Sequence, residues 1–181
     1  LLSLNNFLFS LLLFFVFFPW LSFSLNTMDS QPWVYFIAIL FVLFNIHRVR
    51  IPSFLFYYIF FVSIGFSISL LFTENIFSFP VVRAAGNYFG LFLVALSFYI
   101  YLANGNKFPI KFLYVSNVIW LSVIFFQLIF PDSLSFLVLS RSSFDRGVAS
   151  LAPEPGFFAV HLVFFTWIIL QFFNYKRLPN K

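Results

Sequence analysis

The sequence predicts an all-α protein, a polytopic bundle of about six transmembrane helices. Hydrophobic residues make up 62% of the 181 residues, and charged residues only 8%. With 34 phenylalanines and a mean hydropathy of +1.02, the chain is more apolar than a soluble domain. The apolar residues also occur in runs close to the ~20 residues that cross a bilayer core. We therefore expect lipid to surround most of the protein.

Six apolar segments meet or approach the spanning length, at residues 7–25, 31–47, 54–72, 86–103, 112–130 and 156–173. Their length and near-continuous apolarity favour helices over barrel strands, which alternate apolar and polar residues over about ten positions. The second segment is the shortest, and Pro19 is expected to kink the first. We interpret residues 1–181 as a single transmembrane domain. Because the only methionine is Met28, we expect the chain to be a fragment of a longer membrane protein.

The positive charges between the segments predict the orientation. Seven basic residues follow the second, fourth and sixth segments, namely Arg48, Arg50, Lys107, Lys111, Lys176, Arg177 and Lys181. The alternate gaps carry Arg83, Arg141 and Arg146. By the positive-inside rule, both ends of this fragment face the cytoplasm, and the loop 131–155 faces outward.

The loop 131–155 is the strongest candidate for a functional region. The cytoplasmic gaps 48–53 and 104–111 are short connectors, whereas this loop is about 25 residues long and carries both charge signs. Its apolar stretch LSFLVL at 134–139 argues against disorder. We expect a folded segment that is partly re-entrant or lies on the membrane.

Three arginines and one aspartate are candidates for binding an anionic substrate. Arg141, Asp145 and Arg146 lie in the outward loop, and Arg83 precedes the fourth segment. A guanidinium group suits phosphate and pyrophosphate, but an interfacial arginine can also simply reach lipid phosphates. The alternative role of Asp145 and Arg146 is to fix the shape of the loop. The Gly86-xxx-Gly90 pattern that follows Arg83 predicts close helix packing.

Glu154 and His161 are candidates for proton transfer. Glu154 lies between two prolines at the start of the sixth segment, where it could serve as a general base or only stabilise the helix N-terminus. His161 follows two helical turns later, on the same face if the helix begins by Glu154. An ionisable side chain two turns inside a membrane-spanning helix suggests a functional role. The alternative is a neutral imidazole hydrogen-bonded to a neighbouring helix, with Gln127 or Asn87 as its partner.

The composition also excludes several classes of site. Cysteine is absent, so the sequence has neither disulfides nor cysteine-based metal centres. The two histidines, His47 and His161, are far apart, and no metal site or cofactor is predicted. The net charge of +5 is spread between apolar runs, so nucleic acid is not an expected partner.

The string R-G-x-A-S-x-x-x-E-P-G-F-F-A, from Arg146 to Ala159, resembles bacterial O-antigen polymerases and, more broadly, oligosaccharide repeat-unit polymerases and the O-antigen ligase-like superfamily. It covers less than a tenth of the chain. The resemblance implies an inner-membrane glycosyltransferase that moves an oligosaccharide from undecaprenyl pyrophosphate onto another lipid-linked repeat unit at the periplasmic face. It also implies a chain-length regulator and membrane lipids as partners.

The resemblance further implies roles for the candidate residues. Arg146, with Arg141 and Arg83, would hold the pyrophosphate and stabilise it as the leaving group, beside Asp145. Glu154 or His161 would take the proton of the acceptor hydroxyl. Two alternatives remain at this stage, an O-antigen ligase and a transporter or flippase of lipid-linked glycans. A transporter should carry more charge near the membrane midplane than these segments do.

Overall fold

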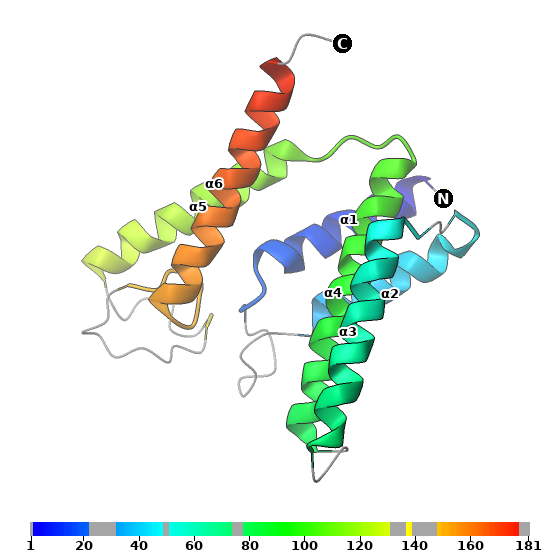
Figure 1. The fold of residues 1–181 in the computed structure, drawn as a ribbon. Helices are drawn as coiled ribbons and strands as arrows, with labels where there is room; N and C mark the ends of the chain where they lie inside the picture. The colour runs from blue at the N-terminus through cyan, green and yellow to red at the C-terminus, as the bar shows by residue number, and fades with distance from the viewer. Residues whose placement is uncertain are drawn as a thin grey trace. The chain divides into compact units, whose positions relative to one another are not determined.

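The computed structural model of the chain is all-α and describes residues 2–21, 32–48, 51–73, 78–130, 137–138 and 148–177. Within these ranges, six α-helices follow the six predicted segments and no strand occurs, so the predicted fold class is confirmed (Figure 1). The helices are α1 (Leu2–Phe17), α2 (Trp33–Phe44), α3 (Ser53–Leu71), α4 (Phe79–Ala103), α5 (Ile110–Ile129) and α6 (Pro155–Arg177). A short 3₁₀ helix, η1 (Ile46–Arg48), follows α2.

Four of the described helices, α3 to α6, are long and apolar enough to cross a membrane. They contain 19, 25, 20 and 23 residues. The other two are shorter than the segments predicted for them, with 16 residues in α1 and 12 in α2. At a rise of 1.5 Å per residue, α2 measures only about 18 Å. The four long helices indicate a membrane-embedded protein.

Prolines set several of the helix boundaries. We expected Pro19 to kink a longer first helix, but α1 ends at Phe17, before the proline, which cannot donate the next helical hydrogen bond. Pro80 and Pro155 instead lie in the first turns of α4 and α6, where no donor is needed. Helix α4 thus begins before residue 86, and Arg83 lies inside it rather than ahead of it.

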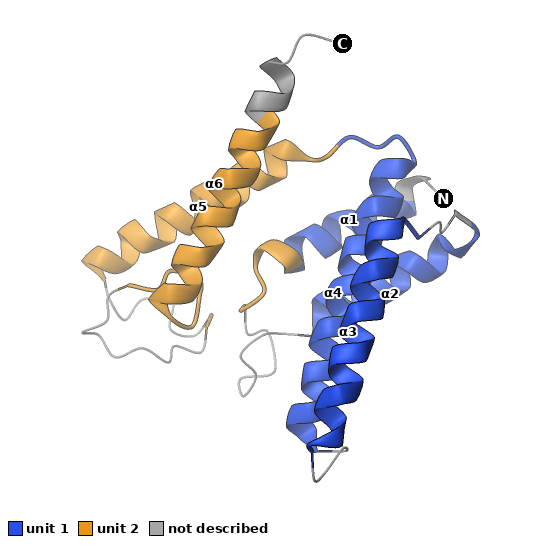
Figure 2. Ribbon diagram, in the orientation of Figure 1, with its two compact units in different colours: residues 1–15, 32–107 blue, residues 16–31, 108–181 orange. Residues whose placement is uncertain are grey.

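The chain divides into two compact units, and the first contains residues 1–15 and 32–107 (Figure 2). Here α4 packs against both α2 and α3. A Cβ added at Gly90 would overlap the ring of Tyr35, with the ring Cγ only 2.8 Å away, whereas Gly86 faces open space. The close packing predicted for the glycine pair therefore holds at Gly90. Further along α4, the single hydroxyl hydrogen of Ser97 points to the carbonyl of Leu93 at 2.8 Å, and the carbonyl of Ala38 lies 3.4 Å from the same oxygen.

The second unit contains residues 16–31 and 108–181. Helices α5 and α6 contact each other in this unit. Trp120 of α5 is only 1% exposed and belongs to the core of this unit. The rings around Trp120 come from α6 and from the residues that follow α1, including Phe158, Phe18 and Trp20.

Much of the helical surface is apolar and exposed. Helix α3 buries Leu55 alone. Large hydrophobic side chains such as Phe61 and Leu71 lie on its outside. A helix that is apolar on all sides is expected in contact with lipid or with other membrane helices, because exposure of this much apolar surface to water is unfavourable. The exposed faces therefore support the interpretation that α3 lies in a bilayer.

Candidate functional site

The structure places three of the six predicted site residues. Glu154 and His161 belong to the start of α6 in the second unit, and Arg83 lies on α4 in the first unit. Arg141, Asp145, Arg146 and most of the loop 131–155 lie outside the described residues. The described part of the candidate site is therefore the segment from 148 to 161 and the residues that it contacts.

Glu154 lies directly at the N-terminus of α6. The helix begins at Pro155, and the backbone carbonyl of Glu154 accepts the first helical hydrogen bond from the amide of Phe158 at 3.3 Å. His161 lies nearly two turns into the helix, whereas Glu154 lies in the bend just before its first residue. The alignment of the two residues on one face therefore stays a prediction.

The side chain of Glu154 is half-buried. Among the described residues, its carboxylate enters no hydrogen bond or ion pair. An ionised carboxylate offers only acceptor positions, so it can receive the hydrogen of an approaching hydroxyl group.

His161 is half-buried among aromatic rings. The centre of its imidazole lies 4.2 Å from that of Phe165, 4.5 Å from Trp120 and 5.6 Å from Trp20. Its Nε2 atom lies 3.2 Å from the backbone carbonyl oxygen of Phe17. Three rings and one hydrogen bond therefore fix the position of this imidazole.

The partner of His161 is different from the two that we expected. The amide nitrogen of Gln127 donates instead to the carbonyl of Ser150, at 3.2 Å. The amide oxygen of Asn87 accepts from the hydroxyl of Tyr35, also at 3.2 Å. The group that bonds His161 is the backbone carbonyl of Phe17, at the end of α1.

The Phe17 carbonyl is open because α1 ends there. The last carbonyls of a helix lack amide partners within it, and Pro19 ends the helical chain. Two side-chain donors bond to the Phe17 carbonyl in place of a backbone amide. They are the indole Nε1 of Trp120, at 3.0 Å, and Nε2 of His161. Since a carbonyl only accepts, Nε2 must carry the hydrogen. In the neutral imidazole, Nδ1 then keeps its lone pair.

Ser150 anchors the segment that leads into α6. Its φ of +54° lies in the left-handed region, which is unusual for a residue with a side chain. The Ser150 hydroxyl donates to the carbonyl of Trp120 at 2.8 Å, and the Ser150 carbonyl accepts from Gln127. The buried Leu151 and Ala152 follow. These contacts hold the segment that precedes Glu154 against helix α5.

Phe17, Trp120 and Ser150 also belong to this arrangement, and they were not predicted from the sequence. Pro19 was a usable signal, because a proline after an apolar run predicts a helix end and therefore open carbonyls. Trp120 and Ser150 are 30 residues apart, and no local pattern predicts that they meet. The described part of the chain brings no three His, Asp or Glu side chains together as metal ligands.

Comparison with known protein families, curated proteins and solved structures finds no match to this chain. The fold and the arrangement around α6 are therefore the basis for a functional argument. Two groups in this arrangement can take part in chemistry, the carboxylate of Glu154 and the imidazole of His161.

Proposed function

We propose that this chain is part of a bacterial inner-membrane glycan polymerase. The enzyme would transfer an oligosaccharide from undecaprenyl pyrophosphate to another lipid-linked repeat unit on the periplasmic side. The observation that carries the proposal is the half-buried carboxylate of Glu154 at the N-terminus of α6, which has no partner among the described residues and follows a loop with Arg141 and Arg146. The four long apolar helices are consistent with an enzyme whose substrate is anchored in a membrane.

The reaction requires a base and a group that stabilises the leaving pyrophosphate. The hydroxyl oxygen of the acceptor sugar attacks the anomeric carbon of the donor, and the bond from that carbon to the pyrophosphate oxygen breaks. The hydroxyl proton passes to the base, and undecaprenyl pyrophosphate leaves with the bonding electrons. Arg141 and Arg146 would balance its charge.

We assign the role of base to Glu154. Its half-buried carboxylate is unengaged among the described residues, and it lies where α6 begins. A base must reach the proton that it abstracts, and the end of a membrane helix is accessible to a polar sugar. His161 is enclosed by three rings and uses Nε2 to hold α1. We assign it a positioning role.

Replacement of Glu154 in the natural gene tests this assignment. Glu154→Gln keeps the size of the side chain but removes the base, so we expect the ladder of long surface polysaccharide to disappear on a gel. Membrane protein levels should be unchanged. A normal ladder from Glu154→Gln would refute the assignment.

The same strain separates the polymerase from the O-antigen ligase. A polymerase defect leaves single repeat units attached to lipopolysaccharide, because the ligase still acts on them. A ligase defect removes all attached forms, including the single repeats. We expect single repeats to remain, and their loss would assign the chain to the ligase.

A further inference from the structure

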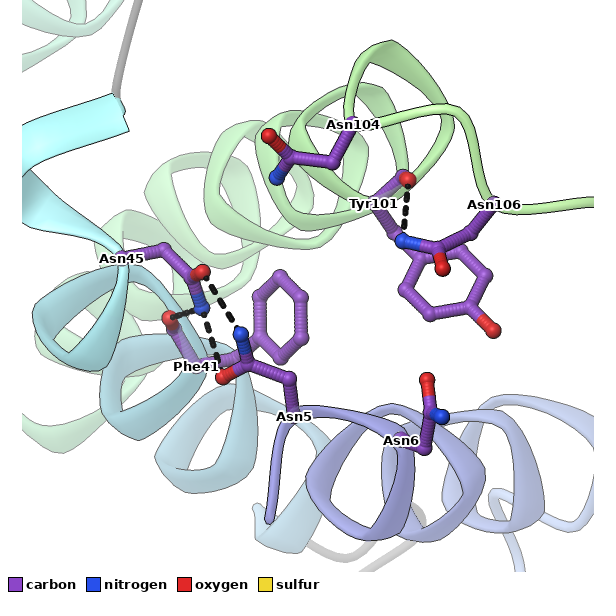
Figure 3. A pocket seen from close by; sticks show the side chains of 7 residues that line it. All are labelled: Asn5, Asn6, Phe41, Asn45, Tyr101, Asn104 and Asn106. Carbon is purple, nitrogen blue, oxygen red and sulfur yellow. Dashed lines mark hydrogen bonds between the residues drawn. The ribbon is translucent and has the colours of Figure 1, made fainter. Parts of the chain in front are cut away.

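A cavity at one end of the first unit is lined by five asparagines and two aromatic residues. Its volume is about 80 Å³ (Figure 3). The lining residues are Asn5, Asn6, Phe41, Asn45, Tyr101, Asn104 and Asn106. None of these seven side chains is charged. The asparagines come from three separate places in the chain, the start of α1, the end of α2 and the residues after α4.

One pair of asparagines forms a fixed wall of the cavity. The amides of Asn5 and Asn45 donate to each other's oxygens at 3.1 and 3.3 Å. Asn45 is only 3% exposed, and its amide nitrogen also donates to the carbonyl of Phe41 at 2.8 Å. On the opposite wall, Asn106 donates to the carbonyl of Tyr101 at 2.9 Å. These bonds hold the polar walls in place.

Two asparagines remain available to a ligand. The amides of Asn6 and Asn104 are exposed and form no hydrogen bond among the described residues. Figure 3 shows the amide of Asn6 projecting from α1 toward the side of the cavity formed by Tyr101 and Asn106. The ring of Tyr101 is itself held by stacking on Phe9, with centres 3.6 Å apart.

The chemistry of these groups matches a sugar better than a phosphate. A carboxamide offers both donors and acceptors, as does each hydroxyl group of a sugar. Phe41 lines the cavity but is only 1% exposed, and Tyr101 is stacked on Phe9, so the asparagine amides carry the match to a sugar. Phosphate sites rely on arginine, lysine or helix N-termini, and no charged side chain lines this cavity.

The position of the cavity favours a head group at a membrane surface. Asn45 precedes the predicted cytoplasmic residues Arg48 and Arg50, and Asn106 precedes Lys107. The cavity thus lies at the ends of helices that the charge pattern assigns to the cytoplasmic face. It is too small to enclose a whole hexose, but the exposed Asn6 and Asn104 leave it open for one edge of the ring.

We infer that this cavity binds the uncharged, hydroxyl-rich head group of a sugar, carried by a glycolipid of the cytoplasmic leaflet or free in solution. The inference is independent of the proposed transfer reaction, which belongs to the predicted outer side. Asn6 and Asn104 supply the free hydrogen-bonding groups, and the Asn5–Asn45 pair shapes the wall.

Native mass spectrometry of the full-length protein, purified in a detergent without sugar, tests the inference. The probes are monoglucosyl diacylglycerol, phosphatidic acid with the same acyl chains, and free methyl glucoside. We expect a larger fraction of the wild-type protein to keep the glucosyl probe bound than to keep phosphatidic acid bound. Asn6→Leu and Asn104→Leu should reduce that retention at least fivefold. The control Asn117→Leu, in the second unit, should not reduce it.

Mutation-sensitive binding of the glycolipid or of methyl glucoside supports the inference and identifies which source fills the cavity. Equal glycolipid retention by both cavity variants, with no mutation-sensitive binding of methyl glucoside, would overturn it, as would a preference for phosphatidic acid. Because a leucine variant can disturb folding, Asn6→Ser and Asn104→Ser provide smaller changes, and circular dichroism checks the helical content of each. None of these results depends on polymer formation, so they stay separate from the test at Glu154.

Discussion

At the scale of the residue, the carbonyl of Phe17 organises the candidate site. It accepts from both Trp120 and His161, and so joins the end of α1 to α5 and α6. This arrangement separates two possible roles of His161. A base needs the lone pair on Nδ1, whereas a positioning residue needs only the hydrogen on Nε2.

Two variants of His161 distinguish these roles. The amide nitrogen of glutamine can occupy nearly the place of Nε2, so His161→Gln should retain the bond to Phe17 and most of the polymer. His161→Leu should lose that bond and about 1 kcal/mol of stability. Unfolding in mixed detergent–SDS micelles measures the stability, and a gel of surface polysaccharide measures the product. Loss of polymer in a stable His161→Gln would assign the base to His161.

Ser150 offers a second test at this scale. Ser150→Ala loses the bond to the Trp120 carbonyl but keeps the unfavourable positive φ, whereas Ser150→Gly loses the bond and removes that cost. We expect Ser150→Ala to be the less stable variant by about 1 kcal/mol in the same unfolding assay. Equal stability of the two would contradict the left-handed conformation at this position.

At the scale of the element, the two glycines of α4 make opposite predictions. Gly90→Ala would force a methyl group into the ring of Tyr35 and should cost about 1–3 kcal/mol. Gly86→Ala meets open space and should be neutral or gain up to about 1 kcal/mol, since alanine favours the helix. Thermal unfolding of the two purified variants provides the comparison. A larger loss at Gly86 would refute the described packing of α2 on α4.

The sequence predicted helices more reliably than it predicted their ends. Long apolar runs can hardly form anything but helices, and all six appear. The start of α4 was missed because Phe79 to Ala85 carry Pro80 and Arg83, which lower the local apolarity. Pro80 is nevertheless compatible with a first turn, and the helix extends through it.

At the scale of the whole molecule, the membrane orientation is a prediction from charge alone. These 181 residues contain no cysteine, so a single cysteine introduced into them is the only one among them and can report the orientation. We expect Ser143→Cys to react with an impermeant maleimide in intact spheroplasts, and Lys107→Cys to react only after the membrane is opened. Labelling of Lys107→Cys in intact spheroplasts, with Ser143→Cys protected, would show the opposite orientation. The loop 131–155 would then face the cytoplasm and could not form an outward site.

Contacts over long sequence distances are what the sequence did not predict. His161 and Phe17 are 144 residues apart, and Asn5 and Asn45 are 40 apart. Each residue is unremarkable in its own segment, since isolated polar residues occur in many apolar helices. Their pairing depends on how the helices pack, and packing of apolar helices is only weakly encoded in the pattern of residues.

The most direct test of the central claim is transfer by the purified full-length enzyme. Lipid-linked repeat units would be supplied in detergent, and the release of undecaprenyl pyrophosphate measured together with the lengthened glycan. We predict that the wild type makes both products in equal amounts and that Glu154→Gln is at least ~100-fold slower, as expected for loss of a general base. Equal rates for Glu154→Gln and the wild type, or no lengthened product from the wild type, would contradict the account.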